Sequence, residues 1–149
     1  MNTTSVTSAE EASEPTDLDQ ELLQVARDIA AITWELKALN TVVIDLRGRV
    51  SYTDFVILAT GTSERHVSAI ARRVDDEMRE AGRPPLGSEG TTQGQWALLD
   101  YGDIIVHVFN KTARQEYDLE RMWSEAPRLE LEDAPDELYG HFEAQGFEP

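Results

Sequence analysis

The sequence predicts one α/β domain, built as a mixed sheet of four to five strands flanked by helices. Three observations support this fold class. Apolar residues recur every three or four positions over 22–39 and 67–78, as in helices that bury one face. Short apolar runs, several of them rich in β-branched residues, predict strands at 41–46, 55–60, 96–99 and 104–109. These segments alternate along a chain of 149 residues, which is enough for a single layered domain.

The first predicted helix follows a polar N-terminal stretch. Thr16, with Asp19 three residues later, resembles a capping box, so we expect the helix to begin near Thr16 and to reach about Leu39. Asn40 should end this helix, because asparagine is tolerated where a helix terminates. The predicted strand at 41–46 then follows directly.

The second predicted helix follows an uninterrupted apolar run. The run at 55–60 lacks polar alternation, which is typical of a strand covered on both faces. Thr62 or Ser63 is suited to cap the helix that follows over 63–81, and Gly82 should stop it. Its predicted core face consists of Val67, Ile70, Ala71, Val74 and Met78.

A β-hairpin is predicted over 96–109. Its two apolar runs are separated by the turn sequence at 100–103, where Gly102 can take the positive φ that a tight turn requires. His107 lies mid-strand, where we expect a hydrogen-bonded sheet histidine rather than a ligand. Tyr101 lies at the tip of the turn, so we expect its side chain to be exposed.

Two further elements complete the order. The glycine-rich loop at 86–94 has room for a short strand before the hairpin. After the hairpin, Thr112 with Gln115 forms a second capping-box pattern, which predicts a helix to about Trp123. One helical turn is expected within 136–142.

The net charge of −16 is concentrated at the two ends of the chain. Residues 1–21 hold six acidic and no basic side chains, and 125–149 hold eight acidic and one basic, which leaves −3 for 22–124. We therefore expect a disordered acidic extension at 1–15, a domain at 16–124, and an acidic, solvated tail after it, at 125–149. Such tails either keep a protein in solution or attract a basic protein partner. No basic stripe is present, which argues against direct nucleic-acid binding.

Composition excludes several classes of protein. The absence of cysteine excludes disulfides, a thiol nucleophile and a zinc–thiolate site. No apolar run approaches the roughly 20 residues of a membrane helix. The N-terminal stretch lacks the apolar and basic regions of a targeting signal, so we expect a cytoplasmic protein. Serine-hydrolase, zinc and calcium motifs are also missing, so we expect no metal and no cofactor.

Two groups of residues have the composition of a catalytic site. At 61–66, backbone N–H groups at a strand-to-helix junction can hold an anion, with Arg65 and His66 nearby, although the spacing is not that of a phosphate-binding loop. The other group comprises Asp45, Asp54, Asp100, Asp103 and His107. A helix cap and a tight turn explain both groups more simply. A nucleotide-handling enzyme that uses the 61–66 loop remains the alternative function.

The hairpin carries two large aromatic residues, Trp96 and Tyr101, beside acidic ones. Exposed aromatic side chains beside carboxylates suit a protein-binding surface. Packing of a rim aromatic on the neighbouring loop explains the same residues equally well. Both interpretations stay open on this evidence.

Four segments resemble one known family. They are GTSERHVSAIA (61–71), PLGSEG (85–90), WALLDYGDIIVHVF (96–109) and RQEYDLERMW (114–123). In this order and at this spacing, they resemble the ribosomal silencing factor family, also called RsfS or Iojap, over residues 20–124. The resemblance implies a nucleotidyltransferase-like fold that lacks the catalytic signature of those enzymes, and therefore a protein that is not an enzyme.

The resemblance also implies a function by obstruction. Members bind ribosomal protein L-fourteen of the large subunit and block joining of the small subunit, which represses translation when nutrients are scarce. Some members form homodimers. On this basis we expect the partner contact to consist of Trp96, Asp100, Tyr101, Asp103 and Glu89. A second set of candidates comprises Leu86, Arg65, His66 and His107.

Overall fold

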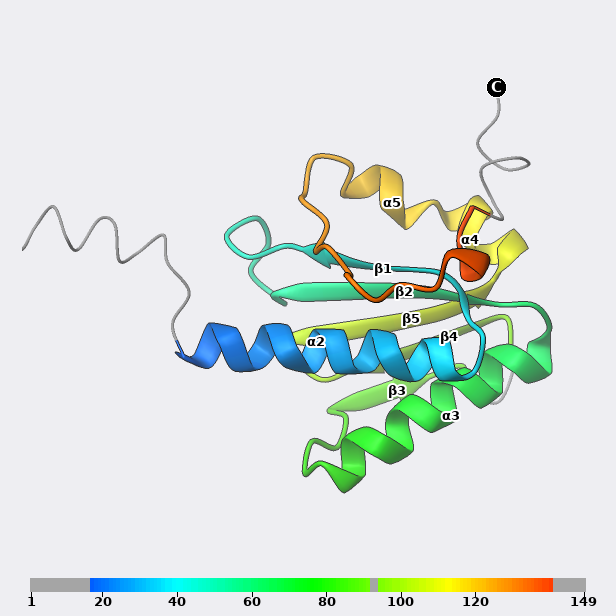
Figure 1. Cartoon of the computed structure of the whole chain (residues 1–149), viewed down its shortest axis with the longest axis horizontal. Coiled ribbons are helices and arrows are strands. Elements are labelled where there is room, and N and C mark those ends of the chain that lie inside the picture. Colours follow the sequence, from blue (N-terminus) through cyan, green and yellow to red (C-terminus); the bar gives the residue numbers. More distant parts are fainter. Residues whose placement is uncertain (1–16, 92–93, 141–149) are drawn as a thin grey trace, which may run out of the picture.

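A five-stranded mixed sheet forms the centre of the structure, a computed structural model that describes residues 17–91 and 94–140 (Figure 1). The strands lie in the order β1-β2-β5-β4-β3. Only β2 and β5 pair in parallel, and the other three pairs are antiparallel. The strands are β1 (Leu39–Asp45), β2 (Phe55–Gly61), β3 (Gly87–Glu89), β4 (Trp96–Asp100) and β5 (Ile104–Asn110). This confirms the predicted fold class of one α/β domain with a mixed sheet.

The helices cover the two faces of the sheet unequally. The long helices α2 (Asp17–Glu35) and α3 (Glu64–Glu80) pack on one face, where α2 runs along the strands in Figure 1. The short helices α4 (Lys111–Tyr117) and α5 (Leu119–Met122) pack on the other face. A single 3₁₀ turn, η1 (Asp136–Leu138), follows near the C-terminus.

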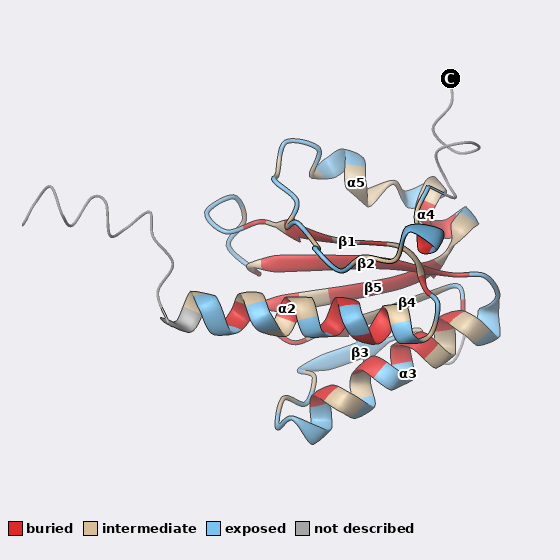
Figure 2. Ribbon diagram, viewed as in Figure 1, coloured by how far each residue is buried: buried red, intermediate tan, exposed pale blue. Residues whose placement is uncertain are grey.

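The central strands are the most deeply buried part of the molecule. All seven residues of β2 are buried, as the colouring of Figure 2 shows, because helices cover both of its faces. Side chains that alternate along β2 therefore enter two separate apolar clusters. Phe55 and Ile57 face α2 and α3, whereas Val56 and Leu58 face the side of α4. This confirms the strand covered on both faces that the apolar run predicts.

Helix α3 follows its sequence pattern closely. Ser63 caps it, with its hydroxyl oxygen accepting the backbone N–H of His66 at 3.1 Å. The five predicted core residues are the five buried residues of the helix: Val67, Ile70, Ala71, Val74 and Met78.

The predicted end of the first helix is wrong. Helix α2 ends at Glu35, because Lys37 takes a left-handed φ of 65° and the amide of Ala38 turns back to the carbonyl of Thr33 at 2.9 Å. Leu39, the expected last helical residue, instead begins β1. The predicted cap at residue 16 lies outside the described residues.

The helix predicted to begin at Thr112 is also wrong in detail. Asn110 is the cap of α4, since its side-chain oxygen accepts the amide of Ala113 at 2.8 Å. The helix then breaks at Asp118, which has a φ of 48°, and α5 restarts at Leu119. The predicted helical turn within 136–142 is present as η1.

The C-terminal acidic stretch does not behave as a solvated tail over its described part. Residues 126–140, which we call the C-terminal strap, run back along β1, the edge strand. The amide of Asp45 donates to the carbonyl of Pro127 at 2.8 Å, and that of Leu129 donates to Val43 at 2.8 Å. Leu138 is buried. The acidic stretch at 1–15 and residues 141–149 lie outside the described residues.

Candidate functional site

Strand β4 divides the predicted site between two faces of the sheet. Its residues alternate, so that Ala97 and Leu99 are buried against α3, whereas Trp96, Leu98 and Asp100 are half-buried on the opposite face. Cross-strand pairing extends this second face to both neighbours of β4. We call the surface formed by Glu89, Trp96, Leu98, Asp100, Ile105 and Tyr117 the β4 face.

Trp96 is the anchor of the β4 face. Its indole N–H donates to Nδ1 of His107 at 3.0 Å, which fixes the orientation of the ring. The ring of Tyr117, the last residue of α4, lies against it with centroids 4.4 Å apart. Phe109 supports the indole from the sheet, at 5.7 Å between centroids. Tyr117 itself is 55% exposed, so the aromatic pair packs against the sheet on one side and is accessible to solvent on the other.

His107 supports this surface and is itself buried. It is 7% exposed, and burial lowers its pKa from 6.5 to about 4, so the ring is neutral at pH 7. Because Nδ1 accepts the hydrogen bond from the indole N–H of Trp96, the hydrogen of the neutral ring resides on Nε2. This confirms the expectation of a hydrogen-bonded sheet histidine.

The prediction of an exposed Tyr101 is wrong. Its side chain is 8% exposed and lies on the α3 side of the sheet, away from the β4 face. The hydroxyl donates to Oδ1 of Asp75 on α3 at 3.4 Å, and burial raises the pKa of the phenol. The backbone does form the predicted turn, but this turn aims the aromatic ring inward. Tyr101 therefore attaches the hairpin to α3.

The acidic turn lies at one end of the β4 face. Gly102 has a φ of 89°, and its amide donates to Oδ1 of Asp100 at 2.8 Å, which is the side-chain turn expected of aspartate. Asp103 lies 3.8 Å from Arg83, and both side chains are partly exposed. Leu86, which is 78% exposed, lies beside Gly102. The structure thus brings one exposed apolar side chain together with two carboxylates.

Arg65 and His66 lie at the N-terminus of α3, where the loop satisfies its own polar groups. His66 Nδ1 accepts the amide of Thr62 at 2.8 Å, and Nε2 donates to the carbonyl of Leu36 at 2.6 Å. The amide of His66 is bonded to Ser63. Two donors that an anion would need are therefore already occupied, which disfavours the phosphate-binding interpretation of this loop. Arg65 is exposed.

Sequence reasoning missed three residues of the β4 face. Leu98 and Ile105 follow from simple alternation, two positions from Trp96 and His107 respectively, but their half-exposure depends on which face the helices cover. Tyr117 has no such signal, because its contact with Trp96 joins residues 21 positions apart.

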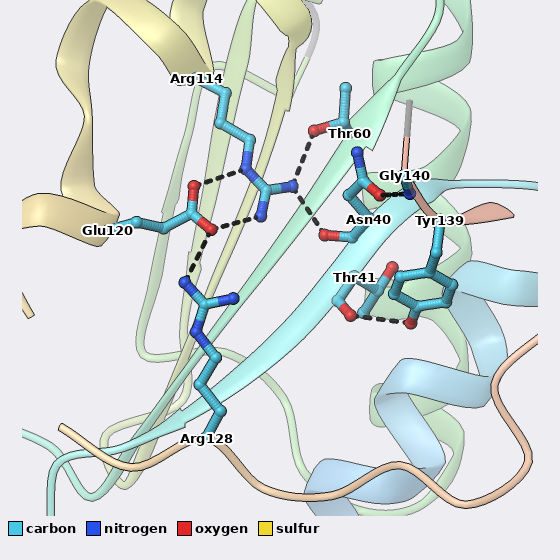
Figure 3. A network of polar contacts seen from close by, with 8 residues as sticks. All are labelled: Asn40, Thr41, Thr60, Arg114, Glu120, Arg128, Tyr139 and Gly140. Carbon is cyan, nitrogen blue, oxygen red and sulfur yellow. Dashed lines mark hydrogen bonds and ion pairs between the residues drawn. The ribbon is translucent and has the colours of Figure 1, made fainter. Parts of the chain in front are cut away.

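A second polar site was not expected at all. The buried guanidinium of Arg114 forms two bonds to the carboxylate of Glu120, at 3.1 and 3.0 Å (Figure 3). Its Nη1 donates to the carbonyl of Asn40 at 2.7 Å and to the hydroxyl of Thr60 at 3.0 Å. Arg128 of the strap also donates to Glu120, at 3.2 Å. Burial raises the pKa of Glu120, but the bonds and charge of Arg114 outweigh this, and the net shift is downward.

The described residues show neither a metal centre nor a membrane helix. No group of three or more histidine and carboxylate side chains within them is arranged to hold a metal ion. None of the helices placed by the structure is both long enough and apolar enough to cross a bilayer.

Fold and site define a class of small α/β domain whose mixed sheet carries two long helices on one face and an anchored aromatic pair on the other. The chain belongs to the ribosomal silencing factor family: the family described as "Ribosomal silencing factor during starvation" matches residues 19–145. A ribosomal silencing factor RsfS from Halalkalibacterium halodurans is 40% identical over 114 residues, which cover 76% of this chain and 95% of the relative. The RsfS of Haemophilus influenzae is 42% identical over 89 residues, covering 60% and 87%.

A solved structure shows the same fold. The crystal structure of a protein from Chromobacterium violaceum superimposes with a TM-score of 0.65 at 35% identity. The matched part covers 70% of this chain and 85% of that one. The family match over residues 19–145 includes both the domain and the C-terminal strap.

Proposed function

We propose that this protein binds the large ribosomal subunit through ribosomal protein L-fourteen and so prevents the small subunit from joining. It acts in the cytoplasm, lowers translation under nutrient limitation and performs no chemistry of its own. Membership of the silencing factor family supports a role at the ribosome. The observation that carries the proposal is the β4 face, an anchored aromatic pair with acidic residues around it.

The β4 face has the composition of a protein-binding surface. Trp96 and Tyr117 supply a rigid apolar centre, and large aromatic residues held in place dominate the energy of most protein interfaces. Leu98 and Ile105 extend this centre along the sheet. Interfaces of this kind lose little side-chain entropy on binding, since the indole is already fixed by its hydrogen bond.

Charge at the rim suits a basic partner. Glu89 is exposed on the edge strand, and Asp100 and Asp103 lie at the end of the hairpin. Ribosomal proteins are basic as a class, so these carboxylates raise the rate of encounter and orient the complex more than they raise affinity. Obstruction then requires only that a bound domain occupy the volume into which the small subunit must move.

The same surface is proposed to form a homodimer. Two β4 faces can bury each other's aromatic centres about a twofold axis, and such a dimer competes with the ribosome for one surface. Sedimentation velocity over a range of protein concentrations measures this directly. A monomer at all concentrations contradicts the dimer without affecting the ribosomal proposal.

Co-sedimentation with isolated large subunits, small subunits and coupled ribosomes tests the proposed function. We expect binding to large subunits alone, and fewer coupled ribosomes as the protein is added. Trp96→Ala should weaken binding by roughly tenfold or more, the usual effect of truncating a central aromatic anchor. No binding by the wild type at near-physiological salt contradicts the proposal.

A matched pair of charge reversals identifies the face. Glu89→Lys reverses a charge at the rim of the β4 face, whereas Glu80→Lys makes the same reversal at an exposed position of α3. We expect Glu89→Lys to slow association several-fold, with an effect that shrinks as salt is raised, and Glu80→Lys to have no effect. Equal effects of the two variants would place the contact elsewhere.

A further inference from the structure

Arg114 is the most highly connected buried charge of the structure. It is 2% exposed, and its bonds reach α5 through Glu120, β1 through the carbonyl of Asn40 and β2 through Thr60 (Figure 3). A guanidinium presents its donors in a fixed plane, so groups bonded to it on several sides are held in fixed relative positions. Arg114 therefore fixes the start of β1 and the end of β2 relative to the two short helices.

Both ends of the C-terminal strap reach the partners of Arg114. At the first end, Arg128 shares the carboxylate of Glu120 with it. At the other end, the amide of Gly140 donates to the side chain of Asn40 at 2.9 Å, and Asn40 gives its carbonyl to Arg114. In Figure 3, Glu120 and Asn40 lie on opposite sides of the guanidinium of Arg114.

The strap end is held a second time by Tyr139. Its hydroxyl donates to the carbonyl of Thr41 at 2.8 Å and accepts the indole N–H of Trp34 at 3.0 Å. Trp34 belongs to α2, so Tyr139 connects the strap both to β1 and to α2. The indole of Trp34 therefore reports whether the strap is docked.

Arg114 also lies one turn before the aromatic pair of the β4 face. It belongs to α4, whose last residue, Tyr117, lies against Trp96. The carbonyl of Arg114 accepts the amide of Asp118 at 3.0 Å, which closes the helix directly after Tyr117. A shift of Arg114 therefore moves the ring that rests on Trp96.

We infer that Arg114 is a positioning residue for the β4 face and couples that face to docking of the C-terminal strap on β1. This inference rests on the proposed function only where the face is said to bind the large subunit. Coupling of this kind is reciprocal: a docked strap favours the binding geometry of Tyr117, and a partner on the β4 face tightens the strap. The strap thus acts as a regulatory element for ribosome binding.

The indole N–H signals of the three tryptophans, assigned with Trp→Phe variants in ¹⁵N NMR spectra, measure the coupling without any ribosome. Tyr139→Phe removes the strap's hydroxyl, and we expect it to shift the signals of both Trp34 and Trp96. Arg128→Gln should also shift Trp96. Arg72→Gln is the matched control, because Arg72 is exposed on α3, on the other face of the sheet from Trp96; it should leave Trp96 unchanged. If the strap stabilises only its own surroundings, the Trp96 signal stays unchanged in every strap variant, and the coupling is contradicted.

Binding to isolated large subunits measures the consequence for function. Arg128→Gln should weaken binding roughly two- to fivefold, which is the range of an exposed ion pair. Arg114→Lys keeps the charge but loses the planar pair of bonds, and it should weaken binding roughly tenfold or more while its circular dichroism spectrum stays that of the wild type. If Arg114→Lys fails to fold, Arg128→Gln and Tyr139→Phe alone decide the question.

The outcomes separate the two proposals. If the wild type does not bind large subunits, the proposed function fails, and the tryptophan signals still decide whether strap and β4 face are coupled. If the wild type binds but the folded strap variants leave Trp96 and the affinity unchanged, the inference about Arg114 is overturned while the proposed function stands.

Discussion

The buried histidine beneath Trp96 makes the stability of the domain depend on pH. In the folded protein, burial lowers the pKa of His107 from 6.5 to about 4. Protonation also removes the lone pair on Nδ1 that accepts the indole N–H of Trp96. In the unfolded chain the pKa returns to about 6.5. Between these two values the unfolded state binds more protons, so the free energy of unfolding falls as the pH falls.

The size of this effect follows from the difference between the two pKa values. A difference of about 2.5 units corresponds to roughly 3 kcal/mol at 1.36 kcal/mol per unit, and the full loss is reached below pH 4. At pH 5 the loss is already about 2 kcal/mol, because the unfolded histidine is almost fully protonated there and the folded one is not. Above pH 7 both states are neutral, and His107 costs nothing.

Urea unfolding followed by far-ultraviolet circular dichroism at pH 7.5 and pH 5.0 measures the effect. The wild type should lose about 2 kcal/mol more than His107→Gln between these two conditions. His66→Gln is the control, because it removes a hydrogen-bonded histidine from the α2–α3 junction and leaves His107 buried. An identical pH dependence in the wild type and His107→Gln would refute the reasoning.

Two further predictions concern packing. Gly61→Ala should lower the free energy of unfolding by about 2 kcal/mol, because a Cβ there would lie 2.7 Å from the backbone nitrogen of Val67. Gly87 has open space around it, so the control Gly87→Ala should cost under about 1 kcal/mol. Equal urea midpoints for the two variants would contradict this prediction. Tyr101→Phe should cost about 1 kcal/mol or less for the bond to Asp75, and Tyr101→Ala about 3 kcal/mol or more for the buried ring. In sedimentation assays Tyr101→Phe should bind large subunits with the affinity of the wild type. A large loss of affinity would indicate that the Tyr101 hydroxyl does contact the partner.

Local patterns were sufficient where each element is decided by its own residues. The core face of α3 follows from apolar spacing because one continuous stripe faces the sheet. The hairpin turn follows from Gly102, the residue that can take its positive φ without strain. The apolar run of β2 is similarly unambiguous.

The failures occur where distant contacts decide. Leu39 continues the apolar spacing of α2, and the sequence alone does not show that Lys37 reverses the chain two residues earlier. The strap is acidic and its apolar residues show no regular spacing, and its docking depends on Tyr139, which meets Trp34 across 105 positions. The position of Tyr101 in a turn predicts an exposed side chain. Its contact with Asp75 on α3, which the local sequence does not show, directs the ring inward.

The single parallel pair at the centre of the sheet has a consequence for how the chain is made. Strand β2 meets its partner β5 at Phe55 and Ile104, 49 positions apart. During synthesis, β1 and β2 can therefore pair as an antiparallel ribbon well before β5 leaves the ribosome. Until then a strand that is apolar from Phe55 to Ala59 has one open edge, an arrangement prone to aggregation. The nascent chain of this member of the ribosomal silencing factor family is thus prone to aggregation while it is still attached to a ribosome.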